Sequence, residues 1–315
     1  MRRTLLTDLP TDKHLTDFTN TCNNDDYNQN KRLLLEDNFN VFNQSSAEAM
    51  IYYFLLHNAL FTNIEHDKKL YPQEGNSKDV DVVGVLENKL SIRIEVKAPE
   101  MPPEDEKIHA KIAFRAANNL EAKEAFESTR NSIVSSMNKV SKKQTVPDKL
   151  DDLKIKTYIE SANGKFHKPS ANNEINVLFV STSTSIMLDF LRYYTNPATG
   201  VFSGDPYFDT EEYPNVDYIV FSNSSECHLD DGFTFNVWDL KKYLCFVLPL
   251  RKNDPNLCKR LIVDRLFDSK LAELSSFHIK NEGNAKEALP VEFWSEEYIA
   301  LNYPQFCCNL SRRKY

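Results

Sequence analysis

The fold of this chain is organised around one stretch, Asp79-Val-Asp-Val-Val-Gly-Val-Leu-Glu-Asn-Lys-Leu-Ser-Ile-Arg-Ile-Glu-Val-Lys97. Its second half alternates apolar and polar residues with period two, which is the pattern of a β-strand. Such a strand places Glu95 and Lys97 on one face and the aliphatic side chains on the other. The apolar run after Asp81 predicts a preceding strand, and the polar residues 87–89 predict a turn. The stretch is therefore expected to form a β-hairpin.

Pairing of the two strands about this turn brings Asp81 back towards Glu95 and Lys97. Carboxylates at one end of a hairpin suit Mg²⁺, which commonly binds one or two carboxylates together with water and substrate phosphate oxygens. A lysine beside them can orient an attacking water or offset the charge of a phosphate. Asp79 competes with Asp81, which we favour because the hydrophobic run follows it directly. The alternative is a solvated hairpin face with a cross-strand ion pair.

The segments Asp81-Val-Val-Gly and Glu95-Val-Lys97 resemble the PD-(D/E)xK nuclease superfamily, which includes type II restriction endonucleases and archaeal Holliday junction resolvases. The resemblance implies an α/β, restriction endonuclease-like core of order αβββαβ, a mixed central sheet flanked by helices, with helical extensions. It also implies that Asp81 and Glu95 bind Mg²⁺, with Mn²⁺ able to substitute, and that the Val96 carbonyl contributes a third oxygen. Lys97 would position or activate water. Acid-x-lysine triplets recur along the chain, but only this one lies on an alternating strand behind an Asp-led strand.

A strongly apolar helix is expected from Ser45 to Leu60. In the resembled family, a glutamate on the helix before the hairpin often completes the metal site, and Glu48 has that place in the order. Ser45 and Glu48 also form an S-x-x-E capping box, in which the glutamate satisfies a backbone amide at the helix start. The sequence leaves both roles of Glu48 open.

The net charge of −8 is unusual for a protein that binds a polyanion, but its distribution matters more than its sum. Residues 107–143 carry a charge of +5 and the remainder of the chain carries −13. A long helix is expected from Ile108 to Val140, directly after the hairpin. Its basic residues and those just beyond it are the expected phosphate contacts: Lys107, Lys111, Arg115, Lys123, Lys142 and Lys143. The alternative is a solvated amphipathic helix with paired Glu and Lys residues.

The expected organisation is a polar arm over residues 1–30, a nuclease-like α/β domain over 31–250 with an insertion at 141–174, and a helical extension of unassigned role over 251–315. The composition is ordinary for a globular protein, with 41% hydrophobic and 27% charged residues. Further elements are predicted from apolar runs: a first strand at 64–71, buried strands at 175–180, 216–221 and 243–250, and helices at 186–194 and 261–274.

Neither a signal-peptide core nor a stretch of about 18 to 20 apolar residues is found, so a cytoplasmic protein is expected. The six cysteines form no zinc-type pair. No P-loop, G-x-S-x-G, H-E-x-x-H or G-x-G-x-x-G motif occurs, which leaves NTP hydrolysis, acyl transfer, zinc proteolysis and dinucleotide binding without support.

The expected function is Mg²⁺-dependent hydrolysis of DNA phosphodiester bonds by a restriction or phage-defence endonuclease. DNA is the expected partner. A homodimer would suit double-strand cleavage, and the sequence leaves open whether a methyltransferase or another defence-system protein is a partner. The alternative is a non-catalytic nucleic-acid-binding or assembly protein that retains the nuclease fold.

Overall fold

A computed structural model of the 315-residue chain describes residues 39–69, 79–87, 89–99, 110–112, 128–129, 131–133, 135–136, 138–139, 145–147, 151–166, 173–195, 201, 209–228, 239–251 and 256–270. Their centre is a six-stranded mixed sheet with the strand order β1-β2-β3-β6-β7-β8. The strands are β1 (Phe61–Lys69), β2 (Asp79–Leu86), β3 (Leu90–Lys97), β6 (Glu174–Ser181), β7 (Tyr218–Ser222) and β8 (Cys245–Pro249).

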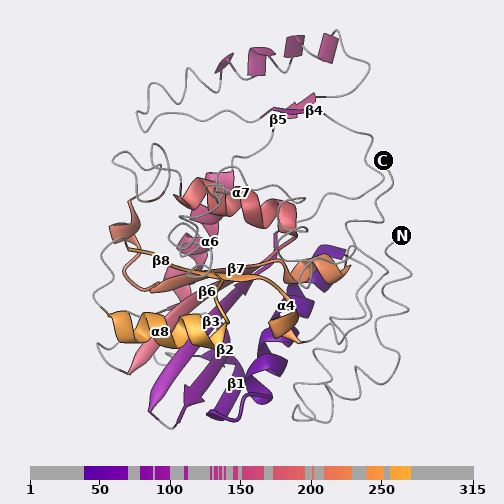
Figure 1. Ribbon diagram of the computed structural model, residues 1–315. Helices are drawn as coiled ribbons and strands as arrows, with labels where there is room; N and C mark the ends of the chain where they lie inside the picture. Colours follow the sequence, from indigo (N-terminus) through magenta and orange to yellow (C-terminus); the bar gives the residue numbers. More distant parts are fainter. Residues whose placement is uncertain are drawn as a thin grey trace, which may run out of the picture.

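Strands β1 to β3 form an antiparallel meander, β3, β6 and β7 are parallel, and β8 closes the sheet antiparallel to β7. The helices are α4 (Phe39–Leu56), α6 (Asp151–Lys165), α7 (Thr184–Thr195) and α8 (Leu257–Leu266). Helices α4 and α8 cover one face of the sheet, and α6 and α7 cover the other (Figure 1). Because α6 and α7 each join parallel strands, their common face agrees with a single crossover handedness.

Burial on both faces explains the continuous apolar runs. In β6, Ile175, Val177 and Phe179 join the core beneath α4 and α8, whereas Leu178 and Val180 join the core beneath α6 and α7. A parallel strand covered by helices on both sides has no solvated face, so polar alternation is lost. The chain is therefore an α/β protein with a mixed sheet between two helical layers.

The predicted hairpin is confirmed. Strands β2 and β3 pair antiparallel and meet at the turn through Leu86 and Leu90, while Glu87 in the turn adopts a φ of 48°. Gly84 is required for packing, because a Cβ at this position would lie 2.6 Å from Cδ1 of Phe61. The aliphatic residues of β3 face α4, and Glu95 and Lys97 project from the opposite face.

Three details of the predicted elements are wrong. Helix α4 begins at Phe39, so Ser45 lies inside the helix and the capping-box interpretation of Glu48 fails. The long helix expected over 108–140 is interrupted, because Ala110–Ile112 forms strand β4, which pairs with β5 (Thr145–Pro147) in a separate two-stranded sheet. The expected insertion at 141–174 contains α6, a helix that is not among the predicted elements.

Helices α6 and α8 both belong to the main body of the domain. Ile155, Ile159 and Ala162 of α6 are buried in the core shared with α7. Val263 of α8 is buried in the core that α4 shares, together with Phe267, the C-cap residue that follows α8. The start of the expected C-terminal extension is thus packed on the sheet, while the polar arm predicted over 1–30 lies outside the described residues.

Candidate active site

The candidate site lies where β2 and β3 separate. Their paired residues end at Val82 and Ile94, so the next backbone groups of β3 lack the usual partners on β2. The side chain of Asp81 replaces one of them: its Oδ2 accepts a hydrogen bond of 2.7 Å from the backbone N–H of Val96. The carboxylate of Asp81 is thereby held at the end of the hairpin, with 7% of its residue surface exposed.

Four charged side chains converge at this point, and we name them the carboxylate cluster: Asp81, Glu95, Lys97 and Lys165. Nζ of Lys97 and Nζ of Lys165 each lie 2.7 Å from Oε1 of Glu95. Nζ of Lys165 also donates a 3.1 Å hydrogen bond to Oδ1 of Asp81. Glu95 is fully buried, whereas the lysine side chains retain about a fifth of their exposure, 22% for Lys97 and 18% for Lys165.

The electrostatics of the cluster reflect this burial. Burial raises the pKa of Glu95 to about 7, the negative charge of Asp81 adds to the increase, and Lys97 and Lys165 oppose it. Burial lowers the pKa of Lys165, but attraction to Asp81 and Glu95 outweighs it, so the net shift is upward. Lys165 therefore remains an ammonium ion at neutral pH.

Gln44 of α4 fixes the backbone of β3 on either side of Lys97. Its Nε2 donates to the carbonyl oxygen of Val96 at 2.9 Å, and its Oε1 accepts from the N–H of Ala98 at 2.8 Å. The same Nε2 lies 2.7 Å from Oε1 of Glu48, so Glu48 reaches the site through Gln44. Because a carbonyl oxygen has two lone pairs, the Val96 oxygen keeps one free of this amide.

The sequence placed Asp81, Glu95 and Lys97 together, and the structure brings them together. Asp81 rather than Asp79 is the acid that contacts Lys165. No three His, Cys, Asp or Glu side chains within the described ranges are grouped closely enough to hold a metal ion, so Glu48 does not complete a three-carboxylate set with Asp81 and Glu95.

The predicted phosphate contacts are largely outside the described ranges, namely Lys107, Arg115, Lys123, Lys142 and Lys143. The backbone of Lys111 is described and lies in β4, opposite Val146 of β5. It belongs to the two-stranded sheet and not to the sheet that carries the carboxylate cluster. The basic surface remains a prediction.

Sequence reasoning missed Lys165 and Gln44. A signal for Lys165 exists in the apolar stripe Ile155, Ile159, Ala162 and Phe166, which predicts a helix that ends beside it. Gln44 lies one helical turn before Glu48, so it shares the face on which the sequence already placed a candidate acid.

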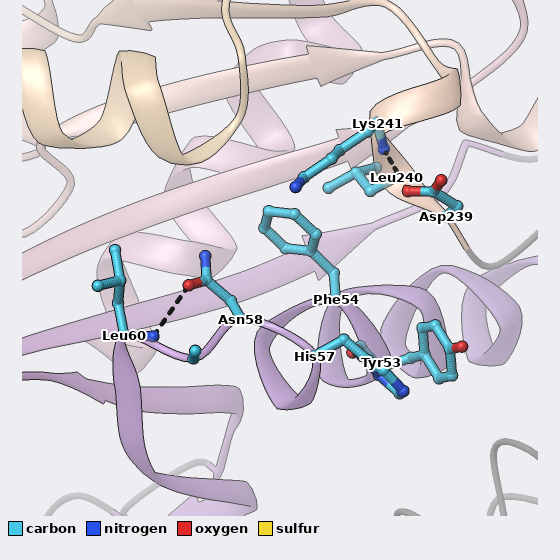
Figure 2. Close-up of a pocket in the computed structure, with 9 residues that line it drawn as sticks. Tyr53, Phe54, His57, Asn58, Leu60, Asp239, Leu240 and Lys241 are labelled. Atoms are coloured by element: carbon cyan, nitrogen blue, oxygen red, sulfur yellow. Dashed lines mark hydrogen bonds between the residues drawn. The ribbon is translucent and has the colours of Figure 1, made fainter.

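A separate cavity of about 600 Å³ lies between the end of α4 and the short helix η4 (Leu240–Lys242). In Figure 2, Phe54 points towards Leu240 and Lys241, and His57 lies beside Tyr53. His57 is exposed, and its ring centroid is 3.9 Å from that of Tyr53. No lining residue of this cavity belongs to the carboxylate cluster.

No protein-family model, no curated protein and no solved structure matches the chain. Within the described residues, none of the helices has the length and apolar character needed to cross a membrane.

Proposed function

We propose that this protein is a metal-dependent deoxyribonuclease that hydrolyses DNA phosphodiester bonds, acting as a restriction or phage-defence endonuclease. The observation that carries the proposal is the convergence of Asp81 and Glu95 on one cationic group, with Lys97 beside them. A sheet that needed only structural ion pairs would not be expected to bury two carboxylates so close together, because their mutual repulsion is costly.

The order of elements supports the resemblance to PD-(D/E)xK nucleases. Helix α4, the meander β1-β2-β3, helix α6 and the parallel strand β6 occur in the order αβββαβ that the family implies, with β4 and β5 of the separate two-stranded sheet between β3 and α6. The acids lie on the second and third strands, at the end where the hairpin opens. The restriction endonuclease-like core is therefore part of the proposal.

The carboxylate cluster suits a divalent cation in its donor chemistry. Oδ1 of Asp81 and Oε1 of Glu95 both contact the ammonium of Lys165, so oxygens of two acids already surround one positive charge. Oε2 of Glu95 is buried and has no hydrogen-bond partner among the described residues. Mg²⁺ commonly takes one or two carboxylates and completes its shell with water and phosphate oxygens. Asp81 and Glu95 would hold the ion, with the Val96 carbonyl as a third protein ligand.

When bound, the cation would lower the pKa of the attacking water and polarise the phosphoryl group. Lys97 Nζ would hydrogen-bond to the water and orient it for in-line attack on phosphorus, while its charge offsets the charge that develops on the phosphate oxygens. A bond would form between the water oxygen and phosphorus while the bond from phosphorus to the 3′ oxygen breaks. The attacking water would lose a proton to solvent, and the departing 3′ oxygen would take up a proton from solvent. The products are a 5′-phosphate and a 3′-hydroxyl. Gln44 would hold Lys97 in place through Val96 and Ala98.

The test is cleavage of supercoiled plasmid and of linear single- and double-stranded DNA with Mg²⁺ or Mn²⁺. Wild type is compared with Asp81→Asn, Glu95→Gln and Lys97→Met. Metal-dependent cutting that all three substitutions abolish would establish the site. Lys156→Met is a matched control, because Lys156 lies on α6 and contacts Glu160 at the surface.

The opposite result is equally informative. If purified wild type binds DNA and never cuts it under these conditions, the protein is a binding module that retains the fold. Cleavage that survives Glu95→Gln would show that the activity resides elsewhere in the chain or in a contaminant.

A further inference from the structure

Lys165 lies where a cation held by Asp81 and Glu95 would lie. Its Nζ is 3.1 Å from Oδ1 of Asp81 and 2.7 Å from Oε1 of Glu95. Mg²⁺ would need the same oxygens at about 2.0 to 2.1 Å, and it dehydrates only for close, well-placed ligands. An ammonium group and a divalent cation cannot share these positions, since both are positive and they would be in contact.

The charges of the cluster lead to the same conclusion. When Glu95 is ionised, two carboxylates face two ammonium groups, so the cluster is formally neutral without a metal ion. A divalent cation added to this arrangement would leave an excess of two positive charges in a largely buried site. Withdrawal of one ammonium removes half of that excess. Lys165 is the group that must withdraw, because it alone contacts both acids.

We propose that Lys165 is a displaceable counter-ion: it holds Asp81 and Glu95 together in the metal-free protein and competes with the divalent cation for them. The inference rests on the proposed function in one respect, because it takes the carboxylate pair as the cation site. It goes beyond that function by assigning control of cation affinity to Lys165, which is not among the residues that match the PD-(D/E)xK motif.

The local structure allows the side chain of Lys165 to move while its helix stays in place. Helix α6 is anchored by buried Ile155, Ile159 and Ala162, whereas Lys165 is its last residue. Gly164 precedes it and has open space around the position of a Cβ. Lysine has a flexible four-carbon stem, so its ammonium group can leave the acids without a backbone change.

The test measures metal binding without DNA, so it does not depend on cleavage. Mn²⁺ is titrated into the full-length chain by isothermal calorimetry, for wild type, Lys165→Met, Lys165→Arg and the α6 control Lys156→Met. If Lys165 leaves the acids in only about one molecule in ten, removing its charge tightens the apparent Kd about tenfold. Lys165→Arg, which keeps the charge, and Lys156→Met should stay near the wild-type Kd.

A Kd for Lys165→Met equal to or weaker than that of wild type overturns the proposal. If this variant does not fold, the wild type carries the test through NMR of ¹³C-dimethylated lysines, with the Lys165 signal assigned by Lys165→Arg. That signal should move on addition of Mg²⁺, and a signal that does not move contradicts displacement.

The outcomes separate the two proposals. Tighter Mn²⁺ binding by Lys165→Met in a protein that never cuts DNA supports the counter-ion role and contradicts the nuclease. Metal-dependent cleavage by wild type, with no gain in Mn²⁺ affinity for Lys165→Met, supports the nuclease and contradicts the counter-ion role. Absence of Mn²⁺ binding in both wild type and Lys165→Met overturns both.

Discussion

Strand β3 carries two buried charge clusters, and they differ in how acids and bases are matched. In the carboxylate cluster at its carboxyl end, Asp81 and Glu95 share the ammonium of Lys165. In the amino-terminal half, the guanidinium of Arg93 contacts Glu174. Nζ of Lys259 donates to the main-chain oxygen of Glu174 at 2.6 Å. This contact brings no second carboxylate to Arg93.

The number of acids that one base contacts separates a structural ion pair from a candidate cation site. One base on one acid satisfies both charges, and the pair links β3 to β6. In the carboxylate cluster, oxygens of two acids converge on the single ammonium of Lys165, a position that a divalent ion could occupy instead. Burial alone does not separate the clusters, because Arg93 is 7% exposed and Asp81 is 7% exposed as well.

The largest expected effect tests whether the two clusters differ in function. Glu95→Gln should reduce cleavage by at least about a hundredfold, since even outer-shell changes at metal sites cost about 10- to 100-fold. Arg93→Met should leave most of the cleavage intact, because the acid that Arg93 contacts is Glu174, which lies outside the carboxylate cluster. Initial rates of plasmid cutting at saturating Mg²⁺ measure both. Equal loss in the two variants would erase the distinction.

The free energy of unfolding should depend strongly on the ion pair of Arg93 and Glu174, although cleavage should not. Glu174→Ala leaves the buried guanidinium of Arg93 without its acid. Because the Glu174 side chain is 22% exposed, the loss should stay below the about 3 to 5 kcal/mol of a fully buried pair. The free energy of unfolding from urea denaturation checks this value. Glu160→Ala, at the surface of α6, is the control and should cost less than about 1 kcal/mol. A small loss for Glu174→Ala would mean that the bridge is replaceable.

The pH dependence of stability should reveal the raised pKa of Glu95, which burial and the nearby charge of Asp81 produce. The pKa of Glu95 is raised from 4.5 to about 7, so the folded state binds this proton more tightly than the unfolded state. Glu95 should therefore lower stability progressively as pH rises from about 4.5 to about 7, by about 3 kcal/mol in all.

Urea unfolding in EDTA at pH 5 and pH 8 measures that change. Glu95→Gln should lack this component of the pH dependence, because an amide does not titrate in this range. A wild type and a Glu95→Gln variant with the same pH dependence would contradict the raised pKa.

The smallest expected effect concerns the residue that holds Lys97 in place. Gln44→Ala removes hydrogen bonds to Val96 and Ala98, which should cost about 1 to 3 kcal/mol if these groups stay buried without partners. Cleavage should fall less than in Glu95→Gln, with kcat more affected than KM, because misplaced catalytic groups slow the chemical step. Asn63→Ala is an exposed control. A loss as large as that of Glu95→Gln would make Gln44 a direct participant.

Much of the sheet could be predicted from the sequence. The second strand of the hairpin follows from its alternation of apolar and polar residues. The strands β6, β7 and β8 follow from continuous apolar runs, because strands covered on both faces have no solvated side. Helix α6 was missed: polar residues surround its apolar stripe and Gly164 lies within it. The start of α4 was missed as well, since Ser45 and Glu48 imitate a helix start inside the helix.

The placement of Asp81, Glu95 and Lys97 could be read from the sequence, because they lie on one hairpin whose turn and alternation are local properties. Lys165 and Gln44 join them through tertiary packing. Lys165 is 84 positions from Asp81 along the chain, and Gln44 is 52 positions from Val96. These distances are closed by burying the apolar faces of α6 and α4 against opposite sides of the sheet. Hydrophobic packing is non-directional, so no local pattern states which polar residue at a helix end will reach the acids.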